Sequence, residues 1–138
     1  MEATESTGRS VSLVVPAKPD YVVLARLALS AVCRLSPLAP EEVADLKLAI
    51  TEASNWLMGG ERRHQARDDD DGGAGRLQFK FDLTDDSLEL CVGGEEKPTV
   101  SAEERELSMA LIKATVDSYE YGDGLMRLTK RLDFGSEQ

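Results

Sequence analysis

Residues 40–60, PEEVADLKLAITEASNWLMGG, constrain the fold of this chain more than any other stretch. Their apolar residues recur at steps of three and four, which places a single apolar stripe along an α-helix. The stripe comprises Val43, Leu46, Ile50, Ala53 and Leu57. Pro40 fits the first helical turn, and Gly59-Gly60 fits the end of the helix. The pattern predicts one long amphipathic helix.

Glu52 lies on the other side of this helix, with Leu48 and Trp56 one turn to either side. No basic residue stands at the spacing that forms a favourable ion pair along a helix. Two interpretations stay open at this point. Either the carboxylate lines a polar cleft together with the amide of Asn55, or Glu52 is an unpaired residue on a mixed surface face.

The remaining patterns switch between periods typical of strands and of helices. They predict strands at 10–15, 76–83, 87–92, 118–121 and 125–132 and further helices at 19–35 and 102–117. In the last of these helices the expected buried stripe is Leu107, Ala110, Leu111 and Ala114, with Met109 and Ile112 as further candidates. Asp85-Asp86 and Gly122-Asp123-Gly124 predict tight turns. The order indicates an α+β fold: a two-layer sandwich of a mostly antiparallel sheet with about three helices on one face.

The length of 138 residues fits one domain, expected over 11–134, with flexible ends at 1–10 and 135–138. Residues 60–75 combine the aspartate run 68–71 with the following Gly72-Gly73-Ala74-Gly75, which predicts a flexible acidic loop. This run lacks the spaced ligands of a calcium loop, and His64 beside it is expected at the surface.

Composition excludes several classes of protein. No apolar run approaches the ~20 residues of a membrane span, and no signal peptide opens the chain. We expect Cys33 and Cys91 to be small core residues of a cytoplasmic protein. A formal net charge of −10 argues against direct contact with nucleic acid and favours a partner with a basic surface.

Several segments, taken in order, resemble one known family. They are Pro16-Ala17-Lys18-Pro19, Arg26-Leu27, DLKLAITEA at 45–53, LSMALIKATVDSYEY at 107–121 and GLMRLTKRL at 124–132. Together they resemble the RsbW-like anti-sigma-factor serine kinases of the GHKL, or histidine kinase-like, ATPase superfamily. The resemblance covers roughly residues 11–132 and implies a Bergerat-type fold, in which ATP lies between the helices and a lid before the last helix.

The family's motif helix carries Glu-Ala-x-x-Asn, where the glutamate acts as base and the asparagine holds Mg²⁺. The resemblance therefore implies that Glu52 is the base. The asparagine position is Trp56 here, and Asn55 lies about 100° around the helix from it. Asn55 is the candidate Mg²⁺ ligand. Trp56 either plugs the nucleotide cleft or anchors the core or a subunit interface.

Two further family boxes also have altered counterparts in this chain. The adenine-binding Asp-x-Gly-x-Gly turn corresponds to Gly93, Gly94 and Glu95, and the phosphate-binding Gly-x-Gly corresponds to Glu106 and Ser108. A glutamate there adds a side chain and a negative charge where phosphate would lie. The resemblance also puts Thr129 and Lys130 near the nucleotide.

Each lost contact is worth about 1–3 kcal/mol, so the expected cofactor is none or weakly bound Mg-ATP. The function expected is an anti-sigma-factor-like, partner-switching regulator that binds a sigma factor, an anti-anti-sigma antagonist, or both. One alternative is an active Mg-ATP-dependent serine/threonine kinase of the antagonist. Another is an α+β dimeric domain that binds a small ligand. The resemblance also implies a possible homodimer.

Overall fold

The computed structural model describes residues 9–58, 75–94 and 101–132. Within these ranges the chain forms five strands and three helices. Their bounds are β1 (Arg9–Pro16), α1 (Pro19–Cys33), α2 (Pro40–Leu57), β2 (Arg76–Leu83), β3 (Ser87–Gly94), α4 (Ala102–Thr115), β4 (Ser118–Gly122) and β5 (Leu125–Arg131).

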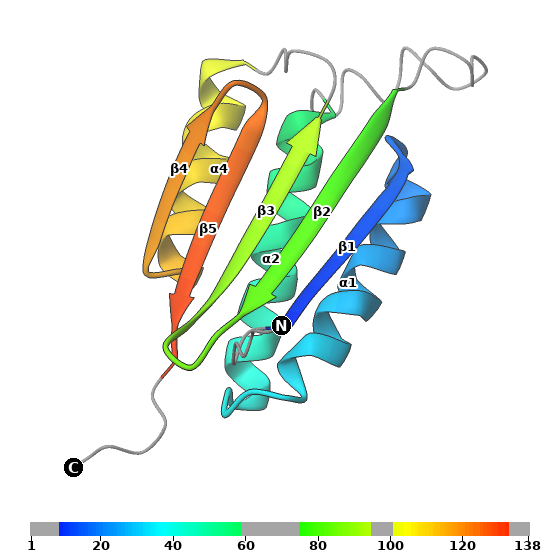
Figure 1. The fold of residues 1–138 in the computed structure, drawn as a ribbon. Coiled ribbons are helices and arrows are strands. Elements are labelled where there is room, and N and C mark those ends of the chain that lie inside the picture. The colour runs from blue at the N-terminus through cyan, green and yellow to red at the C-terminus, as the bar shows by residue number, and fades with distance from the viewer. Residues whose placement is uncertain (1–8, 59–74, 95–100, 133–138) are drawn as a thin grey trace.

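The strands form one sheet in the order β1-β2-β3-β5-β4, and every neighbouring pair is antiparallel. In Figure 1 all three helices lie behind the sheet, so one face of the sheet is covered and the other is open. Strands β1 and β4 form the two edges, and α1 lies behind the β1 side. The predicted α+β two-layer sandwich and its order of elements are confirmed.

The core lies between the sheet and the helices. Along β2, side chains alternate between buried and exposed, as the period of a strand requires. The register pairs Phe79 with Val92 and Phe81 with Leu90, so these buried side chains form rows across the covered face. From α2, Leu46, Ile50 and Ala53 of the predicted stripe are fully buried against this face and Leu57 is 3% exposed, whereas Val43 is half-buried and the buried Ala49 was not predicted.

Local chemistry explains where the helices begin. In α2, Pro40 stands in the first turn and the Ala39 amide donates to the Glu42 carboxylate at 2.9 Å. In α4, Ser101 and Glu104 form a reciprocal capping box, with hydrogen bonds of 3.1 and 3.2 Å.

The β4–β5 turn requires glycine. Asp123 and Gly124 have φ values of 55° and 74°, the left-handed conformation of a two-residue hairpin turn. A Cβ added to Gly124 would also lie 3.1 Å from the Gly94 carbonyl oxygen. The predicted turn at 122–124 is confirmed.

Three expectations need correction. Helix α1 ends at Cys33, two residues early, and β3 continues through Gly93 and Gly94, because both glycines pair with β2. The stripe expected for α4 is wrong: Leu107 is 64% exposed, whereas Ile112 is fully buried. Apolar residues occur all around this helix, so its period could not select the face that meets the core.

The fourth correction concerns Cys91, which is not a core residue. It alternates with the buried Leu90 and Val92, so it points to the open face of the sheet, opposite Arg127 of β5. Cys33, by contrast, is buried as expected. Residues 59–74, with the predicted acidic loop and His64, lie outside the described residues. In the part of the chain that the structure describes, no helix is long and apolar enough to cross a membrane.

Candidate functional site

A polar contact joins α2 to α4 at the predicted site. The hydroxyl of Ser108 donates a hydrogen bond of 3.0 Å to Oε1 of Glu52, although the two residues are 56 positions apart. Glu52 lies on the flank of α2 turned toward α4, because Ala49 and Ala53 beside it face the core. Both side chains are half-buried. The structure therefore brings together two residues that the sequence analysis singled out in separate motifs.

Trp56, one turn after Glu52, belongs to the hydrophobic core and is only 5% exposed. Its ring lies against Tyr121 of β4, with centroids 5.6 Å apart and planes tilted by 60°. From α4, the guanidinium carbon of Arg105 lies 5.8 Å from the ring centroid, a cation–π distance. Trp56 thus joins three elements of the fold, and its buried Nε1 has no hydrogen-bond partner within the described residues.

Arg105 and Tyr121 are absent from the residues that sequence reasoning selected. Arg105 precedes Ser108 by three positions, so both lie on the same face of α4. This spacing could have selected Arg105 from the sequence as a neighbour of Ser108. Tyr121 reaches Trp56 through the pairing of β4 with β5, and no local pattern indicates that contact.

Other predicted site residues do not join this cluster. Asn55 is half-buried on α2, and no hydrogen bond between described residues connects it to Glu52. Glu106 is exposed and, two positions from Ser108, lies on the far side of α4. Glu95 lies outside the described residues.

The two glycines of the second motif, Gly93 and Gly94, contact different parts of the fold. Gly94 fits closely beneath the end of α2, since a Cβ there would lie 3.4 Å from Cβ of Leu57. Its N–H donates to the Gly124 carbonyl at 2.9 Å. Gly93 instead helps line a hollow of about 440 Å³ that includes Val14, Gln78 and Leu125, which stand in one row across the open face of the sheet.

Lys130 lies at the other end of the sheet. It pairs with Leu88, at the start of β3, whereas Gly93 stands near the end of that strand. The Lys130 ammonium lies 3.7 Å from Oε2 of Glu42 in the first turn of α2. Lys130 therefore forms an ion pair there and does not join the cluster around Glu52. Among the described residues, no group of three His, Cys, Asp or Glu side chains could hold a metal ion.

The surroundings of the two thiols, Cys33 and Cys91, raise their pKa values. Burial raises the pKa of Cys33 from 9.0 to about 11, opposed by the nearby Lys47. Burial also raises the pKa of Cys91, although a hydrogen bond with Arg127 opposes that shift. Both thiols are therefore protonated and poorly nucleophilic near neutral pH.

Comparison with known proteins gives consistent matches. A family model described as "Histidine kinase-like ATPase domain" matches residues 15–131. The serine-protein kinase RsbW of Bacillus pumilus (strain SAFR-032) is 33% identical over 82 residues, which cover 59% of this chain and 48% of that protein. RsbW of Bacillus subtilis (strain 168) is 32% identical over 85 residues, covering 62% of this chain and 49% of that protein. The chain thus spans about half the length of the curated relatives it matches.

A solved structure shares the fold. The crystal structure of the RsbU and RsbW domains of Rv1364c from Mycobacterium tuberculosis superposes with a TM-score of 0.59 at 16% sequence identity. The match covers 90% of this chain and 32% of that one.

Proposed function

The chain belongs to the histidine kinase-like ATPase domain family, as an RsbW-like member, and from this membership we propose that it is a partner-switching regulator that acts by protein–protein binding. The partners proposed are a sigma factor, an anti-anti-sigma antagonist, or both, in the cytoplasm. Binding and hydrolysis of Mg-ATP are weakened or lost.

One observation carries this proposal: side chains of the chain itself engage the groups expected to serve the nucleotide. The carboxylate of Glu52, the expected base, accepts a hydrogen bond from Ser108. This hydrogen bond orients the carboxylate toward α4 and engages one of its two oxygens. The neighbouring Trp56 is packed between Tyr121 and Arg105.

The residues present fit Mg-ATP poorly. A buried indole stands where the family motif has the Mg²⁺-binding amide, and its only polar atom is a donor, which cannot ligate a cation. Glu106 replaces a glycine of the phosphate-binding motif with a charged residue, although its exposed side chain lies across α4 from Ser108. These losses support a regulator that works without nucleotide chemistry.

Nucleotide binding tests the proposal, and Trp56 is the natural reporter because it is the only tryptophan in the chain. Mg-ATP is titrated from micromolar to millimolar concentration while tryptophan fluorescence is recorded. We expect no saturable change. A saturable change at micromolar ATP that disappears in Glu52→Ala would overturn the proposal and establish the kinase alternative.

A gain-of-function variant makes the same test in reverse. Trp56→Asn combined with Glu106→Gly and Ser108→Gly restores the family's motif residues at three positions, and binding is followed with a fluorescent ATP analogue after circular dichroism shows a folded protein. The proposal expects tighter binding in this variant than in the parent. Equal micromolar binding by both proteins would contradict it.

A further inference from the structure

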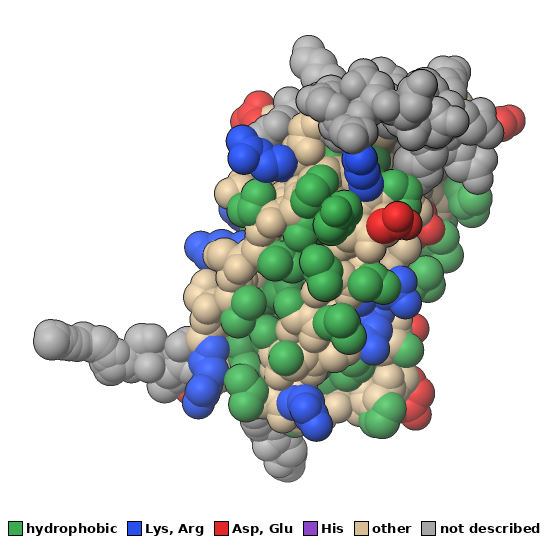
Figure 2. Space-filling view, turned by 90° about the vertical axis from the view of Figure 1, so that its right-hand side faces the viewer, with side chains coloured by type: hydrophobic (Ala, Val, Ile, Leu, Met, Phe, Trp, Pro, Cys, Tyr) green, Lys and Arg blue, Asp and Glu red, His purple; other side chains and the backbone are tan. Residues whose placement is uncertain are grey.

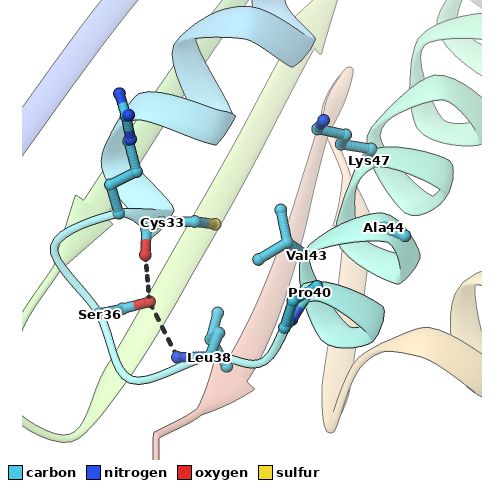
Figure 3. A pocket seen from close by; sticks show the side chains of 8 residues that line it. Cys33, Ser36, Leu38, Pro40, Val43, Ala44 and Lys47 are labelled. Carbon is cyan, nitrogen blue, oxygen red and sulfur yellow. Dashed lines mark hydrogen bonds between the residues drawn. The ribbon is translucent and has the colours of Figure 1, made fainter.

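A second feature of the helical layer lies away from Glu52, where α1 ends and α2 begins. A hollow of about 430 Å³ opens between the two helices, and Figure 3 shows the side chains that line it. Leu38, Pro40 and Val43 give it an apolar wall, and Arg34 and Lys47 are its charged residues. The loop below is held by Ser36, which donates to the Cys33 carbonyl at 2.8 Å and accepts from the Leu38 amide at 3.3 Å. These two hydrogen bonds fix the conformation of the loop that borders the hollow.

The charge of the hollow is opposite to that of the chain. Both charged lining residues are cations, and no carboxylate lines the hollow. Their neighbours one turn away on their own helices are uncharged, and neither makes an ion pair with a described residue. Lys47 comes from α2 and is among the side chains drawn around the hollow in Figure 3. In a chain with a net charge of −10, two cations that form no ion pair among the described residues thus border an apolar wall, an arrangement whose charge is complementary to a carboxylate.

Exposed apolar side chains continue from the hollow along α1. Leu27 is 64% exposed and Val23 48% exposed, on the side of α1 that faces away from the core. Leu27 precedes Arg34 by seven residues, about 10 Å along the helix. Figure 2 shows hydrophobic side chains gathered on the side of the molecule where α1 and β1 lie, with charged side chains of both signs around them. Residues 9–34 contain four basic residues and one acidic residue.

We propose that this hollow and the outward face of α1 together dock a segment of a partner protein that carries a carboxylate beside apolar side chains. The carboxylate lies between Arg34 and Lys47, an adjacent apolar side chain packs on Leu38 and Val43, and further apolar residues cover Leu27. The occupant is a polypeptide because the apolar surface extends well beyond a hollow that a small carboxylate would fill.

This inference rests on the proposed function and names the chemistry of the partner. It reverses the expectation from net charge, which favours a basic partner surface. The net charge describes the whole chain, whereas the charged side chains that line the hollow are both cations; the neighbouring carboxylates Glu41, Glu42 and Asp45 on α2 are not part of its lining.

The experiment uses a short acidic amphipathic peptide of Leu and Glu as the probe, titrated into the ¹⁵N-labelled full chain and followed by NMR. Its control peptide has Gln in place of Glu. We expect saturable shifts confined to α1, the 34–39 loop and the first turns of α2, and binding at least about tenfold weaker for the Gln peptide. Arg34→Glu and Lys47→Glu should each weaken binding of the acidic peptide about tenfold and strengthen binding of a Leu/Lys peptide.

Lys113→Glu is the matched control variant, because it makes the same change of charge at an exposed position in the last turn of α4. It should leave the affinity within about twofold, and each variant must keep the parent circular dichroism spectrum. Equal effects of Lys113→Glu and Lys47→Glu would overturn the docking site, because they would reflect net charge alone. Equal affinity for the Gln peptide, shifts outside the named elements, or hexanoate binding as tight as the peptide would also overturn it.

These outcomes separate the two proposals. A peptide that fails to bind while ATP titration stays flat rejects the docking surface alone. Micromolar ATP binding rejects the proposed function whatever the peptide does.

Discussion

Replacing Trp56 with alanine tests whether the indole is the main link between α2, α4 and β4. The side chain is 5% exposed, so the variant loses nearly its whole buried surface and leaves a cavity, a change that costs about 3–5 kcal/mol in protein cores. The aromatic contact with Tyr121 accounts for about 0.5–1.5 kcal/mol of this and the contact with the exposed Arg105 for about 0.5–1 kcal/mol.

One term acts in the opposite direction. The buried Nε1 of Trp56 has no partner within the described residues, and an unmade hydrogen bond of this kind costs about 1–3 kcal/mol that alanine recovers. We therefore expect Trp56→Ala to lower the free energy of unfolding by about 2 kcal/mol. Trp56→Phe keeps a ring against Tyr121 and removes the N–H, so it should cost less than about 1.5 kcal/mol.

The measurement is urea unfolding at 25 °C followed by far-ultraviolet circular dichroism, with unchanged m-values as the condition for comparing free energies. Leu107→Ala is the control, because Leu107 is on α4 but 64% exposed, and its cost should stay within about 0.5 kcal/mol. Hydrogen exchange gives the local readout: α4 amides should exchange faster in Trp56→Ala while amides of β2 keep their rank. If Trp56→Ala costs no more than Leu107→Ala, the indole does not hold α4, and the reasoning fails.

Three further predictions follow from single contacts. In a double-mutant cycle, Glu52→Ala and Ser108→Ala should couple by about 1–2 kcal/mol in urea unfolding, and a coupling near zero would show that the 3.0 Å hydrogen bond contributes nothing in solution. Gly124→Ala should lower the free energy of unfolding by about 1–2 kcal/mol, because Gly124 has a φ of 74°. Gly122→Ala is the control and should cost less than about 0.5 kcal/mol, because no atom lies near the added Cβ. Equal effects of the two variants would contradict the turn geometry. Burial raises the pKa of Cys33 from 9.0 to about 11, so between these pH values the folded state keeps a proton that the unfolded state loses. The free energy of unfolding should therefore fall by roughly 2–3 kcal/mol as pH rises from 9 to about 11. A Cys33→Ala variant with the same slope of unfolding free energy against pH would refute this prediction.

The fold was largely predictable because its signals are local. Strict alternation in 76–83 and 87–92, the 122–124 turn and the period of α2 each depend on neighbouring residues, and every predicted strand and helix is present. The failures occur where local signals conflict. In α4 the apolar residues Leu107, Met109, Leu111 and Ile112 surround the helix, so only packing against β4 and α2 could show that Ile112 turns inward.

The site was less predictable because its contacts join distant segments. A family resemblance selected Glu52 and Ser108 in separate motifs, and the packing of α4 on α2 brings them within a hydrogen bond. The family resemblance placed Lys130 near the nucleotide. In the structure, the antiparallel register of β5 places it instead beside the first turn of α2. The hollow at Arg34 and Lys47 left no local sign, since each cation alone reads as an ordinary surface residue.

The two flanks of α2 lead to one last prediction. On the side of α4, Glu52 and the ring of Trp56 contact the chain's own Ser108, Arg105 and Tyr121, whereas on the side of α1 Arg34 and Lys47 line the hollow without an ion pair among the described residues. A ligand shifts a conformational equilibrium only by the difference in its affinity for the two states, and nucleotide that binds neither state supplies no such difference. The affinity of a partner for the α1 side should therefore change less than about twofold between zero and millimolar Mg-ATP, measured with the acidic peptide. A larger change would mean that nucleotide opens the contact between α2 and α4, because coupling between the two flanks requires a rearrangement that both ligands sense.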